Sequence, residues 1–143
     1  MVSAKVEGLE RLKAKIAGLA PSIKAAIKPA LEKGADELVA TMKSIVPVAQ
    51  VDGGELRDSI EKHPGRHELA VVVVAGGPTT TRKGKGKPYD YSRAVEFGHV
   101  AEDGSHVPAD PFFYTTYRAR KTRIRNRIKR AISAAAKAAA AGA

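Results

Sequence analysis

Apolar residues recur at helical spacing over two stretches near the start of the chain. In residues 5–19 they stand three and four positions apart, which places them on one face of a helix. Residues 22–46 show the same spacing, with Ser22 as the expected cap. Pro29 lies inside this stretch and predicts a bend or break, because proline cannot donate a hydrogen bond to the preceding turn. The pattern therefore predicts two N-terminal helices.

The pattern then changes to one that is typical of strands. Residues 71–74 are four consecutive valines, and β-branched side chains favour the pleated surface of a sheet. Residues 57–63 and 67–75 flank a turn at Pro64 and Gly65, so we expect them to pair as a hairpin. An unbroken apolar run also predicts that both faces of the valine strand are covered.

Two loops, a short helix and a long helix are expected in the rest of the chain. Residues 76–88 are rich in Gly, Pro and Lys and predict a flexible basic loop that buries nothing. Residues 89–97 predict a short helix that Gly98 ends, before a second loop. A long C-terminal helix is expected from residue 111 to about residue 140, with its apolar stripe carried by Phe113, Tyr117, Ile124, Ile128 and Ile132 and completed by Lys121. Its Ala-rich tail, residues 133–143, has little to bury and is expected either to fray or to become ordered only on binding a partner.

These elements predict an α+β fold, with two N-terminal helices and a long C-terminal helix packed on a small, mostly antiparallel β-sheet. The 143 residues suffice for a single domain, residues 1–143, with one modest core. No run of 18 apolar residues occurs, and the first residues lack the apolar stretch of a secretory signal, so no membrane contact is expected. Cysteine is absent, which excludes thiolate chemistry and fits folding in a reducing cytoplasm.

The chain carries a net charge of +10, with 25 basic and 15 acidic residues. Such a charge favours polyanions or acidic protein surfaces as partners. Eight of the 13 residues in the segment 118–130 are Lys or Arg. A solvated helix face is the plain interpretation, but clustered like charges repel, so we favour contact with a partner. The candidate contact residues are Arg118, Arg120, Arg123, Arg125 and Arg127.

DNA is the less favoured partner of this segment, because it has no aromatic side chains on which bases could stack. A second basic cluster lies in the loop 76–88 and is a candidate for contact with DNA or with the lumen of a pore. It consists of Arg82, Lys83, Lys85 and Lys87. The cluster lacks the spacing of a phosphate-binding loop.

No residue pattern indicates catalysis. Ser59 and Ser92 lack the Gly-x-Ser-x-Gly setting of a catalytic serine. Glu96 and His99 stand three apart, as in some helical metal sites, but Gly98 is expected to end the helix between them. The further polar candidates Asp103, His106 and Asp110 read as loop residues. We therefore expect no catalytic residue, no metal, no cofactor and no enzyme activity.

Three segments, taken in order, resemble a family of phage morphogenesis proteins. The first comprises Val-Pro-Val at residues 46–48 and Gly-Glu-Leu-Arg-Asp-Ser-Ile at residues 54–60. The second is Tyr-Ser-Arg-Ala-Val-Glu-Phe-Gly at residues 91–98, and the third is Pro-Ala-Asp-Pro-Phe-Phe at residues 108–113. Similar segments occur in the neck and tail-completion proteins of phages with long non-contractile tails, including proteins that resemble the minor tail protein Z of lambda.

The resemblance implies a structural virion protein that forms a ring, six-fold in symmetry, at the junction of head and tail and lets DNA pass. The implied partners are other copies of the chain, the stopper, tail terminator and tail tube proteins, and genomic DNA in the lumen. The implied location is the virion, after assembly in the cytoplasm of the bacterial host. The alternative interpretation is a small basic nucleic-acid-binding protein.

Interface anchors are expected at the second and third of these segments, since aromatic side chains dominate protein interfaces. The candidates are Tyr91, Glu96, Phe97 and Phe112. For Phe97 and Phe113, packing in the core is an equally favoured interpretation. Phe112 is preferred to Phe113 as an anchor because Phe113 continues the apolar stripe of the expected helix.

Overall fold

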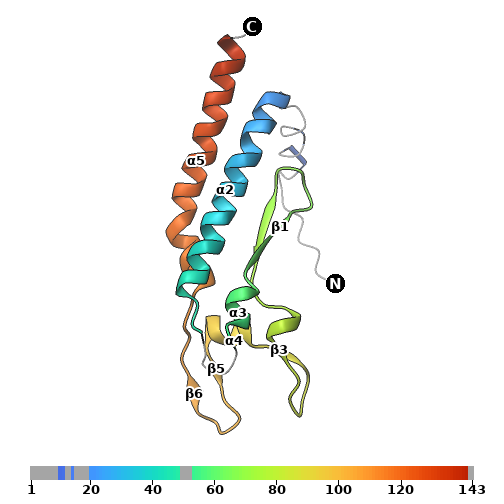
Figure 1. The fold of residues 1–143 in the computed structure, drawn as a ribbon, viewed down its shortest axis with the longest axis vertical. Helices are drawn as coiled ribbons and strands as arrows, with labels where there is room; N and C mark the ends of the chain where they lie inside the picture. The colour runs from blue at the N-terminus through green and yellow to red at the C-terminus, as the bar shows by residue number, and fades with distance from the viewer. Residues whose placement is uncertain (1–9, 12–13, 15–19, 49–52, 142–143) are drawn as a thin grey trace.

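Two long helices dominate the fold (Figure 1). The structure, a computed structural model, describes residues 10–11, 14, 20–48 and 53–141. Helix α2 (Pro21–Ile45) and helix α5 (Phe113–Ala141) lie side by side and run in opposite directions (Figure 1). Most of the small elements gather at the end of this pair where α2 ends and α5 begins.

The small elements are short helices and three antiparallel strand pairs. Strand β1 (Glu61–Pro64) pairs with β2 (Val71–Val74), with Glu61 opposite Val74. This pairing confirms the predicted hairpin. The other pairs are β3 (Thr81–Arg82) with β4 (Tyr89–Asp90), and β5 (His99–Val100) with β6 (His106–Val107). The short helices are α3 (Glu55–Asp58), η1 (Pro78–Thr80) and α4 (Tyr91–Phe97).

The prediction of two N-terminal helices packed on one small sheet is wrong. From residue 20 onward the described N-terminal part is one long helix, α2. The helix expected at residues 5–19 falls almost wholly outside the described residues; only residues 10, 11 and 14 are described there, and these are helical. Within the residues that the structure describes, the strands form three separate two-stranded pairs instead of one sheet. The general α+β class remains.

Helix α2 begins one residue earlier than expected and passes through Pro29 without a break. Pro21 occupies the first turn after Ala20, so Ser22 lies inside the helix and caps nothing. Pro29 leaves the carbonyl of Ala25 without its usual donor. Both residues are exposed, so water can reach that carbonyl and the helix continues to Ile45.

The buried core lies where the end of α2, helix α3 and the start of α5 meet. Five apolar side chains with at most 5% exposure form it: Met42, Val46, Leu56, Ile60 and Phe112. Full burial of such a side chain stabilises the fold by roughly 1.5–3 kcal/mol. Val73 packs against this cluster, but Val72 on the opposite face of β2 is 46% exposed. The expectation that both faces of the valine strand are covered is therefore wrong.

The segment 76–88 contains more structure than a solvated loop. Thr80 is fully buried, and its hydroxyl donates a hydrogen bond to the carboxylate of Asp90, with 2.7 Å between the two oxygen atoms. Asp90 also accepts from the backbone N–H groups of Gly77 and Ser92, so it joins this segment to the start of α4. Burial raises the pKa of Asp90, but these hydrogen bonds outweigh it and leave the pKa below its usual value. The expectation that this segment buries nothing is wrong.

Candidate interaction surfaces

Glu96 is buried within the protomer and caps helix α5. Its side chain leaves the last turn of α4 and accepts hydrogen bonds from the backbone N–H groups of Phe112, Phe113 and Tyr114, all at 2.9 Å. These groups open α5 and have no partner within the helix, and a carboxylate at a helix N-terminus is favoured by the helix dipole. Glu96 is 7% exposed. Its buried carboxylate therefore links α4 to α5 within the protomer.

The aromatic candidates divide between core and surface. Phe112 is 1% exposed and belongs to the core, so it is not a surface residue of the protomer. Phe97 is 63% exposed, and its ring centroid lies 6.0 Å from that of Tyr114, which is also largely exposed. Tyr91 is half-buried under the guanidinium group of Arg82. Contact of these residues with a partner stays a prediction. Phe97 and Tyr114 are the neighbouring pair of aromatic side chains that a partner could reach.

Sequence reasoning missed Tyr114, and the apolar stripe expected on α5 holds only in part. Phe113, Ile124, Ile128 and Ile132 are half-buried, but Tyr117 is not. Thr116 is 3% exposed and Tyr117 is 46% exposed, so the helix turns Thr116 inward instead of Tyr117. The Thr116 hydroxyl donates to the carbonyl of Phe112, which satisfies it in the buried position. Lys121, expected to complete the stripe, is exposed.

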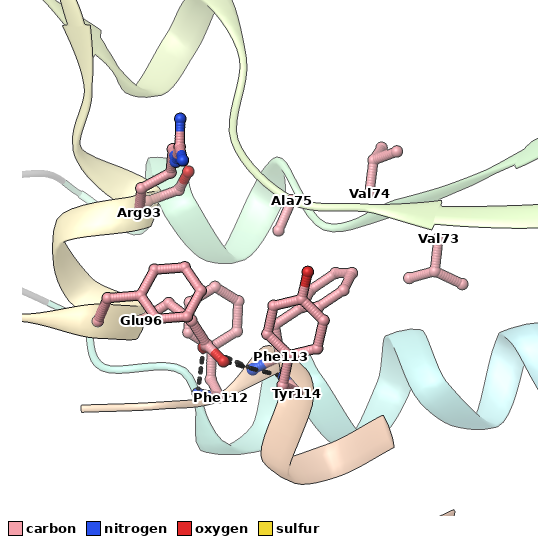
Figure 2. Close-up of a pocket in the computed structure, with 10 residues that line it drawn as sticks. Val73, Val74, Ala75, Arg93, Glu96, Phe112, Phe113 and Tyr114 are labelled. Carbon is pink, nitrogen blue, oxygen red and sulfur yellow. Dashed lines mark hydrogen bonds between the residues drawn. The ribbon is translucent and has the colours of Figure 1, made fainter. Parts of the chain in front are cut away.

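An open hollow lies beside these aromatic residues (Figure 2). It has a volume of about 550 Å³ and is bounded by the end of β2, by α4 and by the start of α5. Its lining combines Val73, Ala75, Phe113 and Tyr114 with one cationic side chain, Arg93. Within the described residues Arg93 has no ion-pair partner, and the carboxylate of Glu96 is already held by α5. The hollow is therefore apolar with a positive charge among its lining residues.

Three of the five candidate arginines of α5 point inward to one carboxylate. Glu37 of α2 lies 2.7 Å from Arg127 Nη2, 3.3 Å from Arg123 Nε and 3.4 Å from Arg120 Nη1. Its side chain is only 17% exposed. The pKa of Glu37 lies below its usual value. The hydrogen bond from Arg127 contributes most to this, the charges of Arg123 and Arg127 add to it, and burial opposes it. These arginines connect the two long helices.

Four further basic residues of α5 form an outward row, which we call the cationic stripe. It comprises Arg118, Lys121, Arg125 and Lys129. Their spacing of three, four and four residues places them on one helix face over about 16 Å. All four are exposed, and none has an ion-pair partner in the part of the chain that the structure describes. Arg118 and Arg125 are thus the two candidate arginines that stay available to a partner.

The second basic cluster is also divided. Arg82 pairs with Glu55, donates to the carbonyl of Thr79 at 2.9 Å and stacks on Tyr91. Lys83, Lys85 and Lys87 lie in the exposed connection between β3 and β4. The structure therefore gives Arg82 a role within the protomer and leaves the three lysines as candidates for contact with DNA or a lumen.

The weighed metal candidates do not converge. Glu96 is used by α5, while His99 and His106 stand at neighbouring register positions of the β5–β6 pair, opposite Val107 and Val100. In the described ranges, no three His, Asp or Glu side chains are grouped so that they could hold a metal ion. Nor does any described helix have the length and apolar character needed to cross a membrane.

Comparison with known proteins identifies the class to which this arrangement belongs. Residues 10–98 match the family described as "Bacteriophage HK97-gp10, putative tail-component". This match covers more than half of the chain, and the chain therefore belongs to that family. It is accordingly a structural protein of a phage tail, with the virion tail as its location. No curated protein and no solved structure gave a significant match.

Proposed function

We propose that this tail component forms a ring at the junction of phage head and tail, through which the genome passes. The observation that carries the proposal is the apolar surface that one protomer leaves in water. Phe97 and Tyr114 are 63% and 47% exposed, with their ring centroids 6.0 Å apart, and Val100 on β5 is 66% exposed. Large exposed apolar groups that lie together are typical of protein interaction sites. A ring would cover such groups once per subunit, through a contact between two different patches.

The resemblance of residues 91–98 and 108–113 to neck proteins favours the junction over other parts of the tail. A tail-completion protein similar to the minor tail protein Z of lambda is the finer assignment that we propose. Its neighbours would be the stopper, terminator and tube proteins, and its ring would be six-fold. Assembly would take place in the cytoplasm of the host. We propose no enzyme activity, since its role would rest on shape and charge.

The test is a phage in which the gene for this chain carries a stop codon. We expect full heads and complete tails that do not join, seen by electron microscopy, and restoration of joining when purified protein is added. Mass spectrometry of wild-type particles should find the chain in the tail fraction. Normal joining without the protein would overturn the proposal.

The alternative function is binding of nucleic acid by a free protomer. The cationic stripe favours it, because four aligned positive charges could neutralise phosphates. We favour protein partners for the stripe, because a strongly cationic ring lumen would retard the passage of DNA. Steeply salt-dependent binding of DNA by a monomer, with no defect in joining, would support the alternative.

A further inference from the structure

The β5–β6 hairpin lies in the longest stretch of the chain without Lys or Arg. Residues 98–117 contain Glu102, Asp103 and Asp110 but no Lys or Arg, in a protein of net charge +10. The hairpin projects from one end of the molecule, and the start of α2 and the end of α5 lie at the opposite end (Figure 1). Val100 on β5 and Val107 on β6 are 66% and 37% exposed. The hairpin thus presents valines together with negative charge.

The hairpin also has a defined shape. The N–H of Ala101 donates to the carbonyl of Ser105 at 2.8 Å, and the N–H of Ser105 donates to the carboxylate of Asp103 at 2.9 Å. Gly98 at its base has a φ of 73°, and a Cβ there would lie 2.8 Å from the carbonyl oxygen of Val107. Only glycine fits this close approach without strain. These contacts set the direction in which the hairpin leaves α4.

The hollow between β2, α4 and the start of α5 has the complementary chemistry. It offers the apolar groups of Val73, Ala75 and Phe113 together with the positive charge of Arg93. No residue of the hairpin lines it. We infer that the β5–β6 hairpin of one copy docks in this hollow of a second copy, with Val100 in the apolar part and Glu102 near Arg93.

Two observations favour a second copy as the occupant. Hairpin and hollow are different patches of the same chain, so their contact is head-to-tail and can close into a ring, which the proposed function requires. The cationic stripe could attract the acidic hairpin by charge, but none of its four side chains is apolar. The exposed aromatic side chains nearest to it on α5, Tyr114 and Tyr117, lie only at its start, and Tyr114 itself lines the hollow. The hollow matches both the charge and the apolar groups of the hairpin, whereas the stripe matches the charge alone.

Cross-linking tests this contact directly, because the wild-type chain has no cysteine. One sample carries Val100→Cys and a second, tagged to change its mass, carries Ala75→Cys. A short bismaleimide is added to each sample alone and to their mixture. We expect a cross-linked dimer of the two different variants in the mixture and little in either sample alone. A matched mixture of Val100→Cys with Arg125→Cys reports on docking to the cationic stripe and should stay uncross-linked.

Charge reversal supplies the second measurement. Glu102→Lys and Arg93→Glu should each weaken self-association about tenfold, as expected for a close charge pair at an interface, and the double variant should recover most of the loss. Arg125→Glu is the control and should leave association unchanged. Circular dichroism shows that each variant is folded before association is measured by sedimentation.

The inference rests on the proposed function, but the two can fail separately. Oligomers that form without the cross-link between positions 100 and 75, or that respond to Arg125→Glu instead of Arg93→Glu, overturn the docking and leave the ring intact. A chain that stays monomeric at every concentration also overturns the docking. Heads and tails that join normally without the protein overturn the function, whatever the cross-linking shows.

Discussion

The carboxylate of Glu96 accepts a hydrogen bond from the backbone N–H of Phe112, which lies 2.9 Å away and is buried in the core. The same carboxylate takes the next two N–H groups of the chain, so one side chain of α4 fixes the start of α5. The Glu-Phe-Gly end of α4 and the Pro-Phe-Phe start of α5 are therefore parts of one structural joint.

Glu96→Ala is expected to destabilise the protein by about 2–4 kcal/mol, because it leaves three N–H donors without acceptors at a buried helix start. Glu96→Gln keeps the shape but loses the negative charge and replaces one acceptor oxygen by an NH2 donor, so at least one N–H loses its acceptor and the cost should be about 1–3 kcal/mol. Urea unfolding followed by circular dichroism measures both. Glu102→Gln removes an exposed carboxylate and, as the control, should change stability by less than about 0.5 kcal/mol. If Glu96→Ala and Glu102→Gln changed the free energy of unfolding equally, Glu96 would not stabilise the start of α5.

Gly34 lies at a close approach of the two long helices. A Cβ at this position would lie 2.7 Å from Cγ2 of Ile124, a β-branched side chain whose rotation is restricted in a helix. Replacing Gly by Ala favours the helix by up to about 1 kcal/mol, but overpacking a core costs about 1–3 kcal/mol. We therefore expect Gly34→Ala to lower stability by about 1 kcal/mol, which thermal and urea unfolding can check.

A double-mutant cycle separates this clash from other effects of the substitution. Ile124→Ala removes the methyl group that the new Cβ would meet, so Gly34→Ala should be neutral or stabilising in that background. An effect of Gly34→Ala that is the same in both backgrounds would show that contact with Ile124 is not its cause.

Glu37 should make the pairing of α2 and α5 sensitive to acid. Its pKa is lower in the folded protein than in the unfolded chain, so its contribution is present above the ordinary pKa of glutamate. That contribution is lost as the pH falls through the folded pKa. Glu37→Gln should therefore lower the melting temperature at pH 7, and the gap between wild type and variant should shrink between about pH 5 and pH 3.

Other carboxylates with a lowered pKa, such as Asp90, titrate in the same range but are present in both proteins, so they cancel in this comparison. A gap that stays constant down to pH 3 would mean that the charge of Glu37 is not what joins the helices.

The sequence pattern predicted the parts of this fold that depend on local spacing. The long helices and the hairpin of β1 and β2 follow from apolar periodicity and turn residues. The roles of the arginines do not, because the hydrogen bonds from Arg120 and Arg127 to Glu37 join residues 83 and 90 positions apart. Spacing along α5 places these arginines on faces, but it does not say which face meets α2.

Phe112 and Phe97 show the same limit at the candidate interface. Phe112 precedes the first residue of α5, so the apolar stripe of the helix does not say where its side chain lies. The sequence pattern favoured Phe112 as an anchor because Phe113 appeared to continue the stripe. Phe113 is indeed half-buried, but the backbone N–H of Phe112 donates to Glu96, 16 residues away, and the side chain of Phe112 lies in the core while Phe97 is exposed.

The cationic stripe should matter for assembly and not for folding. Arg118→Glu and Arg125→Glu alter exposed side chains that have no ion pair within the described residues, so stability should change by less than about 0.5 kcal/mol. Arg127→Met, on the inward face, removes the closest partner of Glu37 and should destabilise the protein by about 1–3 kcal/mol.

If the stripe contacts acidic neighbours in the tail, the outward variants should fail to restore joining of heads and tails in extracts that lack the protein. Their weak binding to duplex DNA, measured by fluorescence anisotropy at several salt concentrations, should change little. Full activity in joining together with a large loss of salt-dependent DNA binding would instead assign the stripe to phosphates, because each lost phosphate contact lowers the salt dependence by about one unit.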